Sequence, residues 1–357
     1  IDSSCCLGSW TQGCVDKVSS VCGELCGPCI GDAGDQPRAE LLIKPKAHAR
    51  VLHERVHQAT GRGAVCPWRV RVEPGEPVGE LYTFTSDASG FDTHSFYYDT
   101  GSEVIVFDAQ FTHPLAEALI EDIRGNTDSP IRWVVITHPN PDKFNGAAPL
   151  QAAGATVVAS EATTAAIPGV HAYKRAYFIG AGAFTEDSYP PQASVDRTFT
   201  DELRLPLASG ATIDLKVLRH AGVASTQTVA HIPAIDALIV GDLVHHGAHA
   251  WLEGGLVDGA PRPDLDAWAA ALDELRAWPG TTVHGGRGEP APLELAITAQ
   301  QDYLVRIEQI VADYVAGVAD PAAFTGPDAA THWAAIAGAA RAAFPERTLD
   351  YLISYGV

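Results

Sequence analysis

Short apolar runs alternate with polar turns and amphipathic segments from residue 67 onward. Apolar runs bounded by Gly, Ser, Asp or Thr predict strands, and apolar positions at helical spacing between them predict helices. In the first half the predicted strands cover residues 68–72, 80–84, 94–98, 103–107, 133–137 and 156–159, and the predicted helices cover 114–125, 144–153 and 161–167. This alternation favours parallel strands with helices over the sheet face.

A second strand-rich half follows residues 172–200, which are rich in Pro, Gly and aromatic residues and are predicted to form a long loop. Its predicted strands cover residues 203–206, 212–218, 228–232, 237–240 and 281–283, with a helix over 263–276. Ala-rich amphipathic segments predict two further helices over 292–316 and 329–343, and a short apolar helix after them. The chain is therefore predicted to hold two β-rich halves, each with helices.

The residues before 67 differ in composition. Cysteines concentrate there, at Cys5, Cys6, Cys14, Cys22, Cys26, Cys29 and Cys66. A segment of about 30 residues buries too little apolar surface to fold alone, so residues 1–35 are predicted to be stapled by disulfides. Thiolates at 22, 26 and 29 also suit a metal or an iron–sulfur cluster, which stays open as an alternative. The odd number leaves one thiol free or bridging two chains.

Residues 36–66 are predicted to form a helical linker, with a helix over 46–57 that begins near Pro45. The sequence begins at Ile1 and not at Met, as expected after removal of an export signal. Together with the cysteines, this predicts a secreted or periplasmic protein.

Charge and hydropathy narrow the choice of partners. The chain has 24 Lys and Arg against 44 Asp and Glu, a formal net charge of −20. Such an acidic chain disfavours nucleic acid and anionic membranes as partners. No apolar run approaches the roughly 20 residues of a membrane span. A small-molecule substrate, a protein partner of the N-terminal segment and a homo-oligomer remain.

The most informative stretch is residues 132–146, where an apolar strand leads into His138-Pro-Asn140-Pro-Asp142-Lys143 and then a glycine-led helix. This pattern resembles the His-x-His-x-Asp-His signature of the metallo-β-lactamase superfamily. Asp108 after its strand and Asp242 within Gly-Asp-Leu occur in the order of the family's conserved positions. The resemblance covers residues 67–300 and implies an α/β fold, a metallo-β-lactamase-like αββα sandwich. A cysteine-rich N-terminal extension and a helical C-terminal tail, residues 301–357, would flank it.

The same resemblance implies that most zinc ligands are replaced. His138, Asp142 and Asp242 are kept, whereas Asn140 and Lys143 stand at two histidine positions. Val223 stands at a third and Arg287 at the last. Catalytic zinc needs about three protein ligands, and the kept residues are divided between two half-sites, so no metal is expected. A different alignment at two places would give an altered metal site with the ligands His138, Asp142, His220, Asp242 and His284.

Two of the replacements are cations, while both carboxylates remain. Two close carboxylates without metal would repel, and one would be driven to protonate. Lys143 and Arg287 supply the missing positive charge, and arginine offers a bidentate fork. We therefore predict an ion-pair network of Lys143 and Arg287 with Asp142 and Asp242 where the metals would lie.

Further candidates are predicted around this centre. His245 and His246 are candidate catalytic residues because imidazoles titrate near neutral pH. The candidate substrate-binding residues are His94, Tyr173, Tyr177 and His249.

Three functions follow from the resemblance. The first is a metal-independent, hydrolase-like enzyme that acts on an ester, lactone or thioester, in which cations stabilise an oxyanion and a carboxylate or imidazole acts as base. The second is a non-catalytic binding or assembly protein that keeps the fold. The third is a metallohydrolase with the altered ligand set.

Overall fold

The computed structural model describes residues 49–55, 68–74 and 79–355. The chain forms two compact units, and the boundary between them lies between Pro77 and Val78. The sequence predicted that the sandwich domain begins at residue 67. The seven cysteines and the predicted disulfide-stapled segment over 1–35 lie outside the described residues.

In the first unit, β1 (Ala49–Arg55) pairs antiparallel with β2 (Trp68–Pro74), and Ala49 lies opposite Pro74. The helix predicted over 46–57 is therefore wrong for residues 49–55. Helical spacing is a weak signal over so short a segment, and pairing with β2 provides hydrogen bonds that outweigh it. The strand predicted at 68–72 exists, but its partner is β1.

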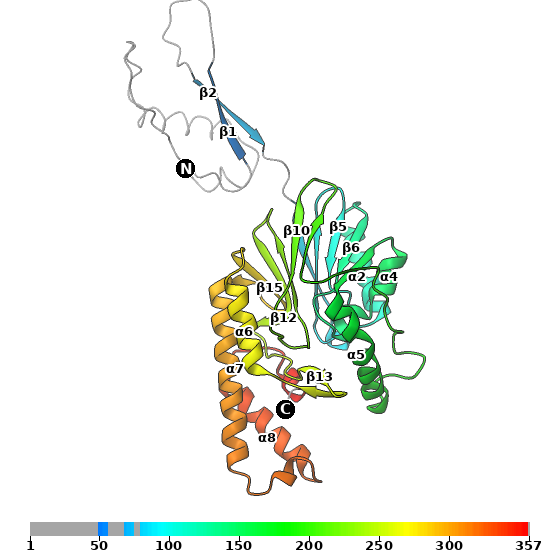
Figure 1. Ribbon diagram of the computed structural model, residues 1–357, viewed down its shortest axis with the longest axis vertical. Coiled ribbons are helices and arrows are strands. Elements are labelled where there is room, and N and C mark those ends of the chain that lie inside the picture. Colours follow the sequence, from blue (N-terminus) through cyan, green and yellow to red (C-terminus); the bar gives the residue numbers. More distant parts are fainter. Residues whose placement is uncertain (1–48, 56–67, 75–78, 356–357) are drawn as a thin grey trace, which may run out of the picture. The chain divides into compact units, whose positions relative to one another are not determined.

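The second unit is a four-layer sandwich of helices, sheet, sheet and helices (Figure 1). The first sheet has the order β3-β4-β5-β6-β7-β8, with parallel pairing from β5 to β8. Its strands are β3 (Glu80–Thr85), β4 (His94–Asp99), β5 (Val104–Phe107), β6 (Ile131–Val135), β7 (Thr156–Ser160) and β8 (Arg197–Phe199). The helices of this half are α2 (His113–Asn126), α3 (Pro141–Phe144), α4 (Ala147–Ala152) and α5 (Glu161–Gly180), and a short 3-10 turn, η2 (Ala88–Gly90), precedes β4.

The second sheet has the order β16-β15-β12-β11-β10-β9, and β12 and β15 are parallel. Its strands are β9 (Glu202–Pro206), β10 (Thr212–Val217), β11 (Thr228–Ile232), β12 (Ala237–His246), β15 (Thr282–Gly288) and β16 (Ala291–Pro292). A hairpin of β13 (Gly255–Val257) and β14 (Ala260–Arg262) follows β12. The helices of this half are α6 (Leu265–Arg276), α7 (Leu293–Ala316) and α8 (Ala329–Ala343), with the 3-10 turns η3 (Pro321–Phe324) and η4 (Asp350–Tyr355).

Alternation along the strands builds the layers. Neighbouring residues in a strand point to opposite faces, so Phe107 packs between the sheets while Val106 packs toward the helices of the first half. Ile239 and Val240 divide in the same way, the first between the sheets and the second toward α6 and α7. The predicted αββα sandwich with helices near its C-terminal end is therefore confirmed.

Three elements are longer than predicted. Helix α5 runs to Gly180 through Pro168, so the loop predicted over 172–200 begins later. The buried side of the helix continues at helical spacing through Lys174 and Phe178. Because Lys174 is charged, the sequence did not show an apolar stripe at this point. Strands β12 and β15 extend to His246 and Gly288 because they pair with each other across two irregularities in register. The described residues contain no helix long and apolar enough to cross a membrane.

Gly146, at the start of α4, offers a test of the packing. A Cβ there would lie 1.9 Å from the Ala109 carbonyl oxygen and 2.8 Å from the Ala116 Cβ. We expect Gly146→Ala to lower the free energy of unfolding by about 3 kcal/mol, because buried backbone cannot yield cheaply. The control is Gly125→Ala on α2, where a Cβ meets nothing within 4 Å, and which should stabilise by roughly 0.5 kcal/mol. Urea unfolding measures both, and equal effects would contradict the packing at Gly146.

Candidate functional site

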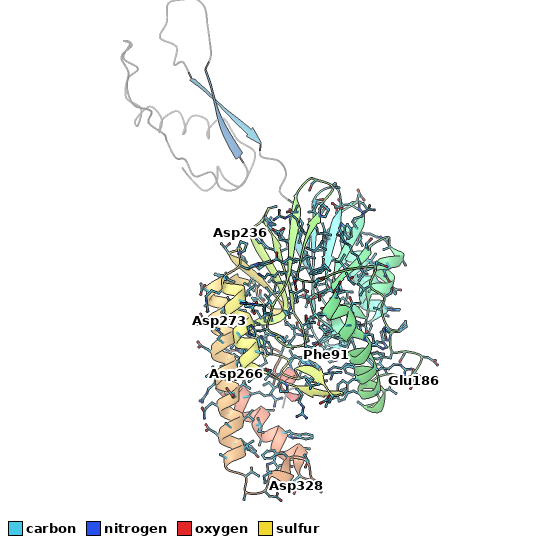
Figure 2. The ribbon with its side chains drawn as sticks, in the orientation of Figure 1. Phe91, Glu186, Asp236, Asp266, Asp273 and Asp328 are labelled. Carbon is cyan, nitrogen blue, oxygen red and sulfur yellow. The ribbon has the colours of Figure 1, made fainter. Side chains whose placement is uncertain are left out.

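The chemistry-bearing residues gather at one end of the sandwich. Figure 2 shows Phe91 at the end opposite Asp236, which directly precedes β12. The site therefore lies toward the carboxyl ends of β5, β6 and β12, where ligands of α/β sheets commonly bind. Asp142 and Lys143 come from α3, and Asp242 comes from β12. Arg287 comes from β15.

Four buried charges form the centre of the site. The Lys143 Nζ lies 2.8 Å from the Asp142 Oδ2 and 2.9 Å from the Asp242 Oδ1. The Arg287 Nη1 donates to the Asp242 Oδ2 at 2.6 Å, and its Nη2 donates to the Asp142 Oδ2 at 3.0 Å. All four residues are buried. The ion-pair network predicted from the sequence is therefore confirmed.

Arginine and lysine make different contacts in this network. The Arg287 fork also donates from Nε to the Phe91 carbonyl oxygen at 2.7 Å and from Nη2 to the Thr93 Oγ1 at 2.7 Å. The Thr93 hydroxyl in turn donates to the Asp142 Oδ2 at 2.6 Å. Lys143 has ion-pair distances but no hydrogen-bond alignment, and its Nζ acts as a point charge between two carboxylates.

The network keeps both carboxylates ionised. Burial alone would raise the pKa of Asp142, but Lys143 and Arg287 outweigh it and lower that pKa to about 2. Burial opposes the charge of Asp242 as well, and Arg287 and Lys143 hold the pKa of this carboxyl well below its ordinary range. The two carboxylates also outweigh burial at Lys143 and raise its pKa. Two negative and two positive charges therefore cancel at neutral pH.

His138 joins the network to the end of β5. Its Nε2 lies 3.6 Å from the Asp242 Oδ2, and its Nδ1 lies 2.9 Å from the Thr137 Oγ1. Thr137 donates to Asp108 from both its backbone amide and its hydroxyl. Burial raises the pKa of Asp108 to about 6, although Lys143 opposes the shift.

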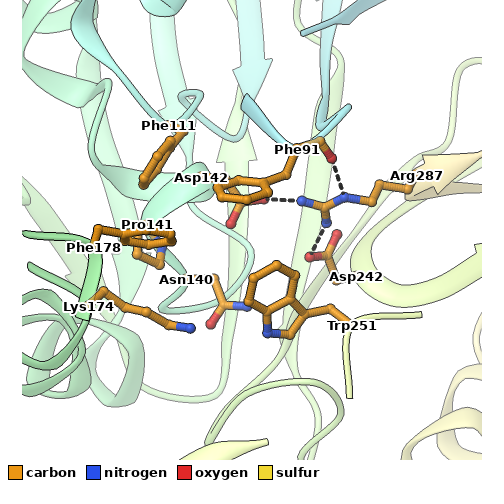
Figure 3. A pocket seen from close by; sticks show the side chains of 10 residues that line it. All are labelled: Phe91, Phe111, Asn140, Pro141, Asp142, Lys174, Phe178, Asp242, Trp251 and Arg287. Carbon is orange, nitrogen blue, oxygen red and sulfur yellow. Dashed lines mark hydrogen bonds and ion pairs between the residues drawn. The ribbon is translucent and has the colours of Figure 1, made fainter. Parts of the chain in front are cut away.

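A small pocket opens onto the network (Figure 3), and its enclosed space of about 20 Å³ holds about one water molecule behind an open mouth. Aromatic side chains form much of its wall, and polar groups converge at Asn140 and the network. The lining residues are Phe91, Phe111, Asn140, Pro141, Asp142, Lys174, Phe178, Asp242, Trp251 and Arg287. The ring of Phe91 lies 5.3 to 5.7 Å, between centroids, from Phe111, Phe178 and Trp251. An apolar wall with a few placed polar groups is typical of small-molecule sites.

Phe91 and Asp92 hold a left-handed backbone, with φ of 63° and 50°. Such conformations are uncommon outside glycine and persist when surrounding contacts enforce them. Here Arg287 binds the Phe91 carbonyl, and the Tyr351 hydroxyl donates to the Asp92 Oδ2 at 2.6 Å. Only a turn signal marked this segment in the sequence, so its part in the pocket was missed.

Sequence reasoning also missed Lys174 and Trp251. The Lys174 ammonium pairs with Glu253 and lies 4.8 Å from the centroid of the Trp251 ring. The Trp251 indole donates to the same carboxylate at 2.9 Å. No local motif brings α5 beside the segment after β12, so this cluster had no signal in the sequence.

The other predicted site residues lie outside this pocket. His245 is fully buried on β12, and burial lowers its pKa to about 3. His249 Nδ1 contacts the Tyr303 hydroxyl at 3.1 Å, and His246 is partly exposed at the end of β12. His94 Nδ1 lies 3.3 Å from the Gly285 carbonyl oxygen, and burial lowers its pKa to about 4. Tyr173 and Tyr177 are on α5 but do not line the pocket, so the roles of these residues stay predictions.

The family model that describes the metallo-beta-lactamase superfamily at the level of sequence matches residues 88–286, more than half of the chain. The chain belongs to this superfamily. A metallo-beta-lactamase from Pontibacter korlensis is a similar solved structure, with 20% identity and a TM-score of 0.45, covering 64% of this chain and 94% of that one. A comparison with curated proteins gave no match. Membership of the metallo-beta-lactamase superfamily supports a hydrolase-like function in general terms.

The residues present do not fit the zinc that the superfamily implies. Lys143 and Arg287 contact oxygens of both retained carboxylates, so a divalent ion would have to compete with two cations at the same atoms. His220 pairs instead with Glu274 on α6, and His284 packs edge-on against Phe96. Within 49–55, 68–74 and 79–355, no group of three or more His, Cys, Asp or Glu is placed to hold a metal. The altered ligand set predicted from the sequence is therefore not assembled around one point.

Lys143→Met tests the network by removing one cation. We expect a loss of about 3–5 kcal/mol in the free energy of unfolding, because two buried carboxylates would share Arg287 alone. Lys216→Met is the control, since Lys216 is a half-buried strand residue whose ion pair with the exposed Glu202 spans 3.5 Å. It should cost less than about 1 kcal/mol. Chemical denaturation at neutral pH measures both, and a small effect at Lys143 would refute the network.

The lowered pKa of Asp142 predicts a pH dependence of stability. A carboxyl whose folded pKa is about 2, against about 3.9 when unfolded, stabilises the fold above pH 4 and loses that contribution as the pH falls toward 2. The loss should be of order 2 kcal/mol for this group. In Lys143→Met the loss over the same range should shrink, because the pKa is less depressed. Urea unfolding at pH 4 and at pH 2.5 tests this, and identical losses in both proteins would contradict it.

Proposed function

We propose that this member of the superfamily is a metal-independent, hydrolase-like enzyme for a small neutral ester, lactone or thioester. The observation that carries the proposal is the network of Lys143 and Arg287 with Asp142 and Asp242 at the floor of an aromatic pocket. The two cations meet the electrostatic need that a metal would meet between two carboxylates.

Charge balance favours a neutral substrate. The network sums to zero, and the pocket cation Lys174 is paired with Glu253. An ionic ligand would leave one buried charge uncompensated, which is costly in a desolvated site. A carbonyl compound with an apolar part suits the rings of Phe91, Phe178 and Trp251 without that cost.

The polar groups that face the pocket differ from those expected. Lys143 is fully buried and engaged by carboxylates, so it acts by keeping them ionised and does not reach a substrate oxygen. Asn140 precedes α3 without using its side chain as a cap, and its side-chain amide, which lines the pocket, makes no hydrogen bond among the described residues. It is therefore the proposed donor to a developing oxyanion.

Asp142 is the proposed site for the attacking water. Its Oδ2 accepts from Thr93 and Arg287, whereas its Oδ1 has no partner among the described residues and the side chain lines the pocket. The Oδ1 is thus placed to orient a water toward a bound carbonyl carbon. Because its pKa is about 2, Asp142 is a weak base, and slow turnover is expected.

The test combines metal analysis with a substrate panel. The purified full chain is dialysed against a chelator, its zinc, iron and manganese are measured, and aryl esters, lactones and thioesters are assayed. We expect hydrolysis that chelation does not change. Asn140→Leu should lower kcat about 10²- to 10³-fold, while the exposed helix variant Gln309→Ala on α7 should not. Activity that requires added zinc, or an unaffected Asn140→Leu, would overturn the proposal.

One observation favours the non-catalytic alternative. Asp142, the pocket carboxylate proposed to hold the attacking water, has a pKa of about 2, far from neutral pH. General acid–base catalysis works best with a pKa near the working pH. A binding protein would show a ligand-induced rise in Tm with the same esters and no product, which separates the two functions.

A secreted or periplasmic location, with disulfides in residues 1–35 and a protein partner or second copy bound there, remains part of the proposal. It is supported by the six cysteines of that segment. Mass spectrometry of the non-reduced chain tests the pairing.

A further inference from the structure

Lys174 is the lysine that lines the pocket. It lies on the buried side of α5 with only 5% of its surface exposed, and its Nζ points toward Asn140 and Trp251 (Figure 3). The other lysine of the site, Lys143, is enclosed by the network and does not line the pocket. Lys174 is therefore the amine that a bound molecule would meet.

The charged and titratable groups that face Lys174 come from three segments. Glu253 pairs with it directly, Asp142 acts on it from α3, and the Tyr173 phenol is on its own helix beside Glu253. Burial lowers the pKa of Lys174, and Glu253 opposes this without cancelling it. The direction is opposite to that at Lys143, whose two carboxylates raise its pKa.

A lysine amine becomes a nucleophile toward carbonyl carbon when it is desolvated beside a proton acceptor. Glu253 is the proton acceptor beside Lys174. Its carboxylate is positioned by Trp251, because the Trp251 Nε1 donates to the Glu253 Oε2 at 2.9 Å. Phe178 and Trp251 form an apolar border of the pocket next to the amine. Nucleophile, proton acceptor and binding surface thus meet at one point.

We propose that Lys174 captures neutral aldehydes or ketones in this pocket as an imine. Glu253 accepts a proton from the ammonium group, and the free amine adds to the carbonyl carbon to give a carbinolamine. The carbinolamine hydroxyl then leaves as water, with the proton returned by Glu253, and a carbon–nitrogen double bond forms. No oxidant or reductant is consumed. This capture goes beyond ester hydrolysis and does not require it.

The experiment is reductive trapping on the full chain with benzaldehyde and cyanoborohydride at pH 7.5, followed by peptide mapping. Lys216 is the internal reference, because it is on the second sheet outside the pocket. We expect Lys174 to be benzylated at least about tenfold faster than Lys216, because a bound aldehyde would be held beside its amine, and butanal, which lacks the ring, to react more slowly at Lys174.

Two variants sharpen the result. Lys174→Arg should remove the rapid labelling and leave that of Lys216 unchanged. Glu253→Gln should shift the pH of half-maximal labelling downward, because the ion pair that raises the pKa of Lys174 is lost. Labelling of Lys174 in the unaltered chain no faster than at Lys216 would overturn the proposal, whatever the variants do. Trapping is scored on the protein itself, so its failure and a failure of ester hydrolysis are separate outcomes.

Discussion

Compensation of two buried carboxylates is the constraint on which this structure depends. Asp142 comes from the first half of the sandwich and Asp242 from the second, and neither is solvated. Uncompensated, such charges cost several kcal/mol each, so the cations beside them are a condition for the fold and not an addition to it. Arg287 crosses between the halves to meet both carboxylates, which makes the electrostatic centre also a mechanical link.

The pocket follows from that link. By binding the Phe91 carbonyl, Arg287 helps to hold a strained turn whose ring becomes the hub of the aromatic wall. The same guanidinium orders Thr93, which holds one oxygen of Asp142 and leaves the other toward the pocket. The Arg287 side chain therefore positions both the polar floor of the pocket, at Asp142, and its apolar wall, at Phe91. Glu253 and Lys174 add a second, smaller ion pair at the edge of this space.

The layers were predictable because they depend on local patterns, and the charged centre was predictable because the resemblance to the superfamily aligned its residues. The continuous apolar run that ends at Phe107 indicates a strand buried on both faces. The resemblance to the superfamily indicated that Lys143 and Arg287 replace histidines beside kept aspartates, which pointed to charge compensation. The aromatic wall was not predictable, since Phe91, Phe178 and Trp251 are far apart in sequence and meet only in the folded chain. Strand β1 was mistaken for a helix because its partner, and not its own spacing, decides its conformation.

The close packing around Asp242 limits which substitutions the site tolerates. A Cβ at Gly286 would lie 2.0 Å from the Asp242 Oδ1 and 3.0 Å from the Lys143 Nζ, so the space is matched to this arrangement. Exchanging either Lys143 or Arg287 for a neutral histidine leaves the buried centre with a net negative charge, unless a cation binds or one carboxylate is also replaced. Neutrality of this centre therefore depends on both cations together, and a neutral substitution is tolerated only when a carboxylate is changed with it.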